Sequence, residues 1–410
     1  MAPVRLESGN LAGVLAPGGL TYVQGCSAES ALWRDELART PGAWGDMTFT
    51  GVFVPGLNRA TYLNGENTRV RTFFMTPELH AAGDRVEFLP LCYADILHHL
   101  RGALIGAALF KVTPPDASGW CSFGPVVDFL ADIWPQIPVR IAQIDDRLPR
   151  TRGHLGIPFD HLTAVIEQSE GAISVSGERQ DAVAGAIARN VANCIPDSAT
   201  VQTGLGRIPG AVLHALRDHR DLRIHSGLIG DGVLALRDAG VLLGEAPITA
   251  GVAIGSAELY AAIGDCDFQF RPVSHTHSAE VIAGLKSFVA INSALEVDLF
   301  GQAYSELTPL GLMSGPGGAT DFARGARLAG GLSIVALPSE TRGRTRVVAS
   351  NPGGLVSMSR FDIDLIVTEQ GVADVRGKDH FKRAQALIAI AHPDHRESLA
   401  RSWTEIAKRL

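Results

Sequence analysis

Short apolar runs alternate with helix-like segments along the first half of the chain. The run Ala103–Val112 is followed by a turn-rich segment, and Val139–Ile144 leads into a polar loop before a further ordered element at Asp160–Glu167. Continuous apolar runs of this length, separated by loops or helices, are typical of strands buried on both faces of a parallel sheet. The first half is therefore predicted to form an α/β sheet.

The second half repeats this alternation. Alanine and isoleucine recur at helical spacing over Asp181–Ala192, and a strand, a glycine loop and a helix are expected over Val201–Val212. Further strands are expected at Leu222–His225, Val289–Asn292, Leu332–Pro338 and Asp364–Thr368, and further helices at Gly232–Ala239 and within His380–Leu410.

We place the domain boundary near Gln180 and Asp181, where the second series of elements begins. The expected fold class is α/β, with an N-terminal open-sheet domain at 1–180 and a C-terminal one at 181–410 that carries the glycine loops. A chain of 410 residues is longer than one hydrophobic core usually supports, which also favours two domains.

Charge and cysteine usage narrow the class of protein. The net charge of −7 disfavours a polyanionic partner, so we expect no nucleic acid. The amino terminus lacks a basic segment followed by an apolar one, and the longest apolar run is too short to cross a bilayer, so we expect a cytoplasmic protein without a membrane partner. The five cysteines are scattered with no Cys-x-x-Cys pair, which predicts buried thiols.

Two glycine-rich segments precede expected helices. The segment Gly204-Leu205-Gly206 follows an apolar strand, and Pro209 suits the first turn of the helix that follows. Such a turn aims backbone N–H groups at an anion or a developing oxyanion, although a tight strand-to-helix turn explains the glycines equally well.

The second glycine segment contains Gly315, Gly317 and Gly318, which would let backbone approach a ligand closely, and Asp321 could cap the next helix. A helix-entry loop with no ligand is the alternative. Arg342 lies downstream beside a strand end and could pair with phosphates or face solvent.

Two histidine pairs suggest a metal, at His275 and His277 and at His392 and His395. Neither pair has a convincing third ligand in the sequence, so we expect no metal site. The sequence also contains no Gly-x-Ser-x-Gly elbow and no phosphate-binding Gly-x-x-x-x-Gly-Lys-Ser/Thr loop, which weakens an assignment as a hydrolase with such an elbow or as an NTPase.

In this order, the segments resemble those of the acetyl-CoA hydrolase/transferase family, which includes the 4-hydroxybutyrate and acetate CoA-transferases. The likeness runs over almost the whole chain. It is carried by KVTPPDASGWCSFG (Lys111–Gly124), LPRTRG (Leu148–Gly153), TGLGRIPGAV (Thr203–Val212), HSGLIGDG (His225–Gly232), NSALEVDLFGQ (Asn292–Gln302), SGPGGATDFARGA (Ser314–Ala326), IVALPSE (Ile334–Glu340), IVTEQGVADVRGK (Ile366–Lys378) and IAHPDHRESL (Ile390–Leu399).

The resemblance implies two open α/β domains with acyl-CoA in the cleft between them, no permanently bound cofactor, a second small-molecule substrate and a homo-oligomer. In such enzymes a glutamate attacks the thioester and becomes a glutamyl-CoA thioester, which an acceptor carboxylate resolves. Carried over residue by residue, the expected CoA contacts are Gly204, Leu205, Gly206, Arg207, Ile208, Gly315, Gly317, Gly318 and Arg342.

The chain departs from the family pattern at the nucleophile. Where family members have a histidine or aromatic residue, a hydroxyl residue and then the glutamate, this sequence reads His225, Ser226 and Gly227, with Asp231 and Gly232 intact. Glycine cannot form an anhydride. His225 shares the face of Gly227 and could act as a general base or pack structurally, whereas Ser226 is expected to point to the opposite face.

The leading prediction is an acyl-CoA enzyme in which a second substrate enters the space left by the glutamate and attacks the thioester directly, either in acyl transfer or in hydrolysis. The alternatives are a ping-pong CoA-transferase that uses another glutamate, and a catalytically silent CoA-binding protein. Glu245 and Glu296 are weak candidates for that glutamate, and Glu296 is expected to have a structural role.

Overall fold

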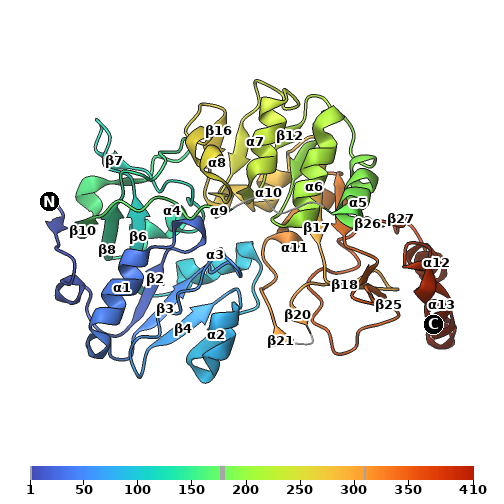
Figure 1. Cartoon of the computed structure of the whole chain (residues 1–410), viewed down its shortest axis with the longest axis horizontal. Coiled ribbons are helices and arrows are strands. Elements are labelled where there is room, and N and C mark those ends of the chain that lie inside the picture. The colour runs from blue at the N-terminus through green and yellow to red at the C-terminus, as the bar shows by residue number, and fades with distance from the viewer. Residues whose placement is uncertain (1, 176–180, 309–310) are drawn as a thin grey trace. The chain divides into compact units, whose positions relative to one another are not determined.

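The protein is described by a computed structural model that covers residues 2–175, 181–308 and 311–410 (Figure 1). It divides into two compact units. The first holds residues 2–175 together with Thr249–Thr276 and Leu312–Gly317, and the second holds the remaining described residues. The expected boundary residue Gln180 lies outside the described residues.

The two units are not contiguous in sequence, which differs from the expected division into 1–180 and 181–410. Arg271 Nη1 donates to the Gly153 carbonyl oxygen at 3.0 Å, and the Ser314 N–H donates to the Met75 carbonyl oxygen at 2.9 Å. These bonds attach two later segments to the first unit. As a result, Gly315 and Gly317 belong to the first unit and Gly318 to the second.

Within the described residues, the first unit is built on an eight-stranded sheet in which neighbouring strands are parallel. Its strand order is β1 (Val4–Arg5), β10 (Ala164–Glu167), β8 (Val139–Ile144), β6 (Ile105–Val112), β2 (Leu20–Val23), β3 (Thr48–Gly51), β4 (Arg69–Thr72) and β5 (Val86–Phe88). The helices of this unit are α1 (Ala31–Arg39), α2 (Pro77–Ala81), α3 (Tyr93–Gly102), α4 (Leu130–Ile133), α8 (Ala257–Ala262) and α9 (Val273–Thr276).

The described part of the second unit has a six-stranded sheet that is parallel except at one edge. Its strand order is β12 (Arg223–Ile224), β11 (Thr200–Gln202), β17 (Phe288–Ser293), β22 (Leu332–Ala336), β26 (Leu365–Thr368) and the antiparallel β27 (Gly371–Asp374). Its helices are α5 (Ala182–Ala192), α6 (Arg207–Ala215), α7 (Asp231–Asp238), α10 (Ala279–Ala283), α11 (Ala319–Leu328), α12 (His380–Ala389) and α13 (Pro393–Ala407).

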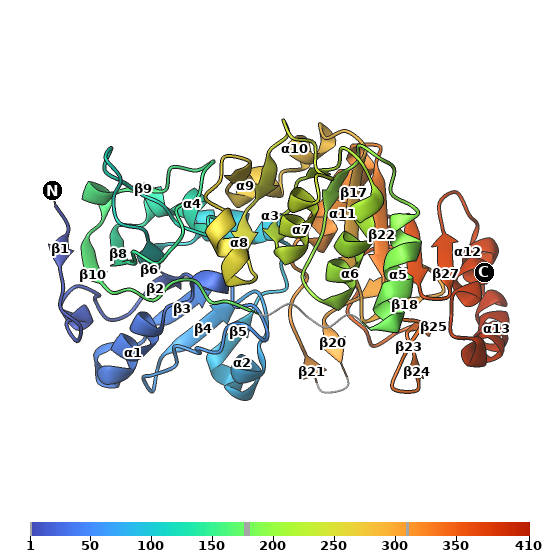
Figure 2. The same cartoon turned by 45° about the horizontal axis from the view of Figure 1, so that its top comes forward.

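Two groups of helices cover this second sheet. On one side of it, α5 packs against β26 and α6 against β17, and α7 packs on α6 (Figure 2). The crossover β11–α6–β12 runs along the sheet in the opposite direction to β17–α11–β22, so right-handed crossovers place α6 and α11 on opposite faces. Helix α10 packs on α11, where Gly325 leaves room for the Ile282 side chain. A small apolar cluster of Ile282, Phe288, Ala290, Phe322 and Ala326 fills the space between these helices and β17.

The predicted α/β architecture with parallel sheets is confirmed, but strands β1–β5 of the first sheet were not predicted. The carboxyl-terminal segment is helical as predicted and forms two helices, because Pro393 lacks an N–H group and begins a new helix, α13. The N-cap of α11 is Gly318, and Asp321 lies in the first turn of the helix, which begins at Ala319. Cys26 and Cys121 are buried as expected, but Cys92 and Cys194 are half-buried and Cys266 is exposed.

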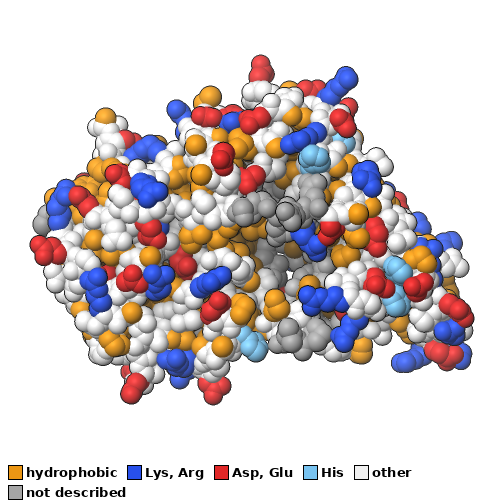
Figure 3. Space-filling model, viewed as in Figure 1, with side chains coloured by type: hydrophobic (Ala, Val, Ile, Leu, Met, Phe, Trp, Pro, Cys, Tyr) orange, Lys and Arg blue, Asp and Glu red, His pale blue; other side chains and the backbone are white. Residues whose placement is uncertain are grey.

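The surface carries charges of both signs. Figure 3 shows acidic and basic side chains interspersed with uncharged ones over the face drawn. Among the described residues, no helix is both long and apolar enough to cross a membrane.

Candidate functional site

The first glycine loop joins the buried strand β11 to α6. Gly206 is the N-cap of α6 with φ +108° and ψ 177°, a conformation that is essentially restricted to glycine. It supplies no side-chain cap, and the next N–H groups, those of Arg207 and Ile208, have no acceptor within the helix. A Cβ added at Gly204 or Gly206 would meet no atom within 4 Å. The loop is therefore open, and its geometry suits an anion or oxyanion.

Leu205 and Arg207 are exposed in this loop, and Ile208 is half-buried. The Arg207 guanidinium forms an ion pair with Asp181, whose carboxylate also caps α5 by accepting from the Ala184 N–H at 2.8 Å. The loop is thus tied to the start of α5, while its backbone faces open space.

The segment His225–Ser226–Gly227 continues from β12 and is buried. The Ser226 side chain is fully buried, and its Oγ lies 2.9 Å from the Thr203 carbonyl oxygen and 2.7 Å from that of Leu228. A hydroxyl hydrogen directed at backbone carbonyls fixes the turn and is not poised for nucleophilic attack. The His225 ring packs edge-on against Phe288, with 6.3 Å between ring centroids.

The imidazole of His277 lies against Gly227. An ideal Cβ at Gly227 would stand 2.6 Å from His277 Cε1 and 2.7 Å from Nε2, and a Cβ at Gly318 would stand 2.5 Å from the same Nε2. Real Cβ atoms essentially never approach that closely. Gly227 and Gly318 therefore flank one imidazole. We expected the space beside Gly227 to be vacant, but the His277 ring occupies it.

Burial determines the charge of His277. The side chain is 4% exposed and its ring centroid is 4.6 Å from that of Phe322. Burial, followed by the charge of His225, lowers the pKa of His277 to about 3. The imidazole is therefore neutral at physiological pH. The sequence did not predict that His277 packs against Gly227, because the fold brings these two distant positions of the chain together.

His275 lies in the helix α9 (Val273–Thr276), and His277 follows that helix. His275 belongs to the first unit and His277 to the second. Burial, followed by the charge of Arg271, lowers the pKa of His275. In the described part of the chain, neither residue belongs to a group of three side chains that could ligate a metal.

The second glycine segment has mixed roles. A Cβ at Gly315 would stand 2.1 Å from the Phe73 carbonyl oxygen, so this glycine allows close packing inside the first unit. Gly317 has φ +61° and forms a parallel bridge with Cys92. Only Gly318, at the start of α11, lies next to His277.

Arg342 stands in the turn of a hairpin formed by β23 (Glu340–Thr341) and β24 (Arg344–Thr345), and it is exposed with φ +54°. Glu296 has structural partners, because one carboxylate oxygen lies 3.6 Å from Arg346 Nη1 and the other accepts from Asn351 Nδ2 at 3.2 Å. Glu245 is exposed in the loop after α7.

A buried carboxyl group in the first unit was missed by the sequence reasoning. Asp128 is 2% exposed with φ +31°, and burial, followed by the charge of Asp132, raises its pKa to about 8. Burial, followed by the charge of Asp128, also raises the pKa of the Tyr22 hydroxyl and of the Cys26 thiol. At neutral pH this carboxyl group is largely protonated. Its sequence context, Val126-Val127-Asp128-Phe129, carries no recognisable motif.

Comparison with known proteins bears on the function. Residues 255–403 match the family described as the acetyl-CoA hydrolase/transferase C-terminal domain. The chain is 36% identical over 334 residues to a 4-hydroxybutyrate coenzyme A transferase of Clostridium kluyveri, covering 77% of this chain and 76% of that protein. It is also 36% identical over 338 residues to a succinyl-CoA:acetate/propanoyl-CoA:succinate CoA transferase of Fasciola hepatica, covering 78% of this chain and 70% of that one.

Solved structures agree over the whole length. RipA from Yersinia pestis superposes with a TM-score of 0.91 at 26% identity, covering 98% of this chain and 97% of that one. A 4-hydroxybutyrate CoA-transferase from Porphyromonas gingivalis gives a TM-score of 0.81 at 28% identity, covering 99% and 98%.

Proposed function

From the premise that this chain belongs to the acetyl-CoA hydrolase/transferase family, as a transferase or thioester hydrolase acting on acyl-CoA, we propose that it works without a glutamyl-CoA intermediate. A second substrate, water or another small nucleophile, attacks the thioester directly. Gly227 stands where the resemblance places the family's glutamate.

One observation carries this proposal, namely the position of the His277 ring. Because the imidazole already lies within 2.6 Å of the place a Cβ would take at Gly227, the site is built around an absent side chain. The site therefore differs from one that has only lost a carboxylate, because the His277 ring takes up the space. A neutral ring packed between Gly227 and Gly318 is a less polar neighbour for an acyl group than a carboxylate would be.

In the proposed reaction, the thioester carbonyl oxygen accepts hydrogen bonds from the N–H groups of Arg207 and Ile208. The attacking group adds to the carbonyl carbon, and these N–H groups stabilise the resulting oxyanion. The C–S bond then breaks and CoA leaves as a thiolate, which is balanced by the proton that the attacking group loses. Ser226 supports the loop, since its hydroxyl donates a hydrogen bond to the carbonyl oxygen of Thr203, the residue before Gly204.

His225 is the remaining candidate for moving that proton. It lies on the segment next to Gly227, and its charge affects the pKa of His277. With a pKa of about 3, His277 is a much weaker base, so we assign it the role of shaping the site.

Trapping tests the absence of the intermediate. The purified chain is incubated with acetyl-CoA, reduced with borohydride and digested, and the peptides are mapped by mass spectrometry. A glutamyl-CoA thioester would be reduced to an alcohol at the glutamate. We expect no reduced glutamate. A reduced residue at Glu245, Glu296 or any other glutamate would restore ping-pong transfer, and a CoA-transferase known to form the adduct, treated in parallel, controls for trapping efficiency.

A further inference from the structure

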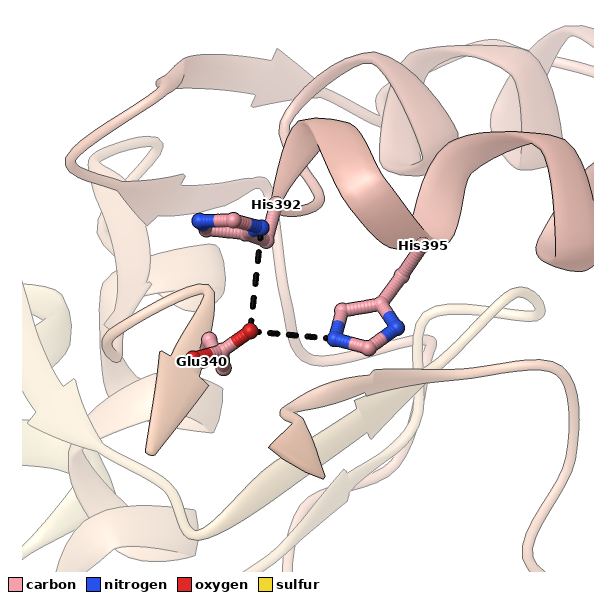
Figure 4. Close-up of side chains that lie close together, drawn as sticks. All are labelled: Glu340, His392 and His395. Atoms are coloured by element: carbon pink, nitrogen blue, oxygen red, sulfur yellow. Dashed lines mark hydrogen bonds and ion pairs between the residues drawn. The ribbon is translucent and has the colours of Figure 1, made fainter. Parts of the chain in front are cut away.

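Three possible metal ligands converge in the second unit (Figure 4). Glu340 begins the β23–β24 hairpin, His392 is the N-cap of α13, and His395 lies in the first turn of that helix. The sequence offered the two histidines without a third ligand. The fold supplies it by bringing the hairpin against the start of α13.

One carboxylate oxygen faces both rings. Glu340 Oε2 lies 3.1 Å from His395 Nε2 and 3.7 Å from His392 Nδ1, and all three ligand atoms lie within 4.8 Å of one another. His392 Nδ1 is shielded from solvent and has no hydrogen-bond partner among the described residues. A polar nitrogen that is buried and aimed at a carboxylate, but beyond hydrogen-bond distance, indicates that a bonding partner is missing between them.

The distances suit a small divalent ion. Zinc binds imidazole nitrogen and carboxylate oxygen at about 2.0–2.2 Å, so neighbouring ligand atoms in a tetrahedral site lie about 3.3–3.6 Å apart. The two oxygen-to-nitrogen distances, 3.1 and 3.7 Å, fall on either side of that range. Two imidazoles with one carboxylate favour a transition ion over Mg²⁺ or Ca²⁺, which prefer oxygen ligands.

The surrounding charges are balanced. The N-terminus of α13 carries a partial positive charge that opposes a cation. Glu340 offsets it, as does Asp394, whose Oδ2 lies 3.7 Å from His392 Nδ1 and whose side chain is 82% exposed. The three ligand side chains are 26–30% exposed, so an ion can reach them.

We propose that Glu340, His392 and His395 bind one divalent transition-metal ion, with zinc as the ion that fits this donor set and water completing the coordination. The ion joins the base of the hairpin to the first turn of α13 and takes no part in the acyl-CoA reaction. A His395–Glu340 hydrogen bond with no ion is the alternative that the test must exclude.

Titration calorimetry tests the proposal. The full chain, prepared without a histidine tag, is stripped of metal with a chelator, dialysed and titrated with zinc. We expect one Zn²⁺ per chain, and at least about a tenfold loss of affinity in each of Glu340→Gln, His392→Ala and His395→Ala. Glu340→Gln retains an acceptor for His395, so it separates metal binding from hydrogen bonding. His80→Ala removes an exposed histidine of the first unit and should leave the affinity unchanged.

A second measurement does not depend on the variants folding. X-ray absorption of the zinc-loaded wild-type chain should show scattering from two imidazoles and additional oxygen ligands. The proposal is wrong if the wild type binds no stoichiometric zinc, if binding survives all three substitutions, or if the spectrum lacks the two imidazoles.

Discussion

The glycines of the loop before α6 and those beside His277 differ in what surrounds them. Around Gly204 and Gly206 a Cβ would meet nothing within 4 Å, whereas at Gly227 and Gly318 it would stand 2.5–2.6 Å from one imidazole. The first pair leaves backbone accessible, and the second pair makes room for a side chain from elsewhere in the fold. The same residue type therefore leaves backbone open in one place and makes room for a packing contact in the other.

Alanine at the packed positions should have the largest effect on stability. Gly227→Ala and Gly318→Ala force the buried His277 ring to move, which should lower the free energy of unfolding by about 2–3 kcal/mol. Gly204→Ala, at an open position without positive φ, should stay within about 0.5 kcal/mol of the wild type. Chemical denaturation with circular dichroism measures all three.

The contact itself can be isolated by a double-mutant cycle. Combining Gly227→Ala with His277→Ala should cost less than the sum of the two single changes, because the collision is gone. Additive losses would show that the glycine is required for some other reason.

Valine at Gly206 should have a smaller effect on stability but a clear effect on binding. The positive φ should cost about 1–2 kcal/mol of unfolding free energy, and the side chain would cover the exposed N–H groups, so CoA binding measured by calorimetry should be abolished. Gly240→Val is the matched control, because Gly240 also has positive φ, +70°, with no atom within 4 Å. It should be strained yet bind CoA normally. Unchanged CoA affinity in a folded Gly206→Val chain would remove the loop from the site.

Titration of His277 should give the smallest effect. Its pKa of about 3 in the folded state lies below its ordinary value, so the unfolded chain binds the proton more readily, and stability present above about pH 6.5 is lost as the pH falls. Between pH 7 and pH 6 this loss should be less than about 1 kcal/mol. His277→Gln should lack this part of the pH dependence, and equal slopes in the two proteins would place His277 in a more polar environment.

Continuous apolar runs report burial directly, and from them the sequence predicted β6, β8, β11, β12, β17, β22 and β26. It predicted no strand at β1–β5, which are short, and none at β27. The strand predicted at Val139–Ile144 is β8, and the helix predicted over Asp181–Ala192 is α5 with Asp181 as its cap. The sequence did not predict that Thr249–Thr276 belongs to the first unit, because a short segment does not reveal which unit it packs against.

The sequence predicted only those parts of the candidate site that a short segment of the chain forms by itself. A glycine loop before a helix is readable within a few residues, as Gly206 illustrates. The packing of His277 on Gly227, and of Glu340 beside His392 and His395, depends on contacts between segments far apart in the chain. The missing Cβ at Gly227 was visible in the sequence, but what occupies its place was not.

Restoring the carboxylate tests most directly whether the His277 ring defines this site. The backbone at Gly227 lies outside the left-handed region, so a side chain is sterically possible once the ring is removed. We predict that Gly227→Glu combined with His277→Gly gains exchange of labelled acetate into acetyl-CoA. Gly227→Glu alone and His277→Gly alone should show none. Exchange by the wild-type chain, or a folded double variant that binds CoA without gaining exchange, would contradict the account.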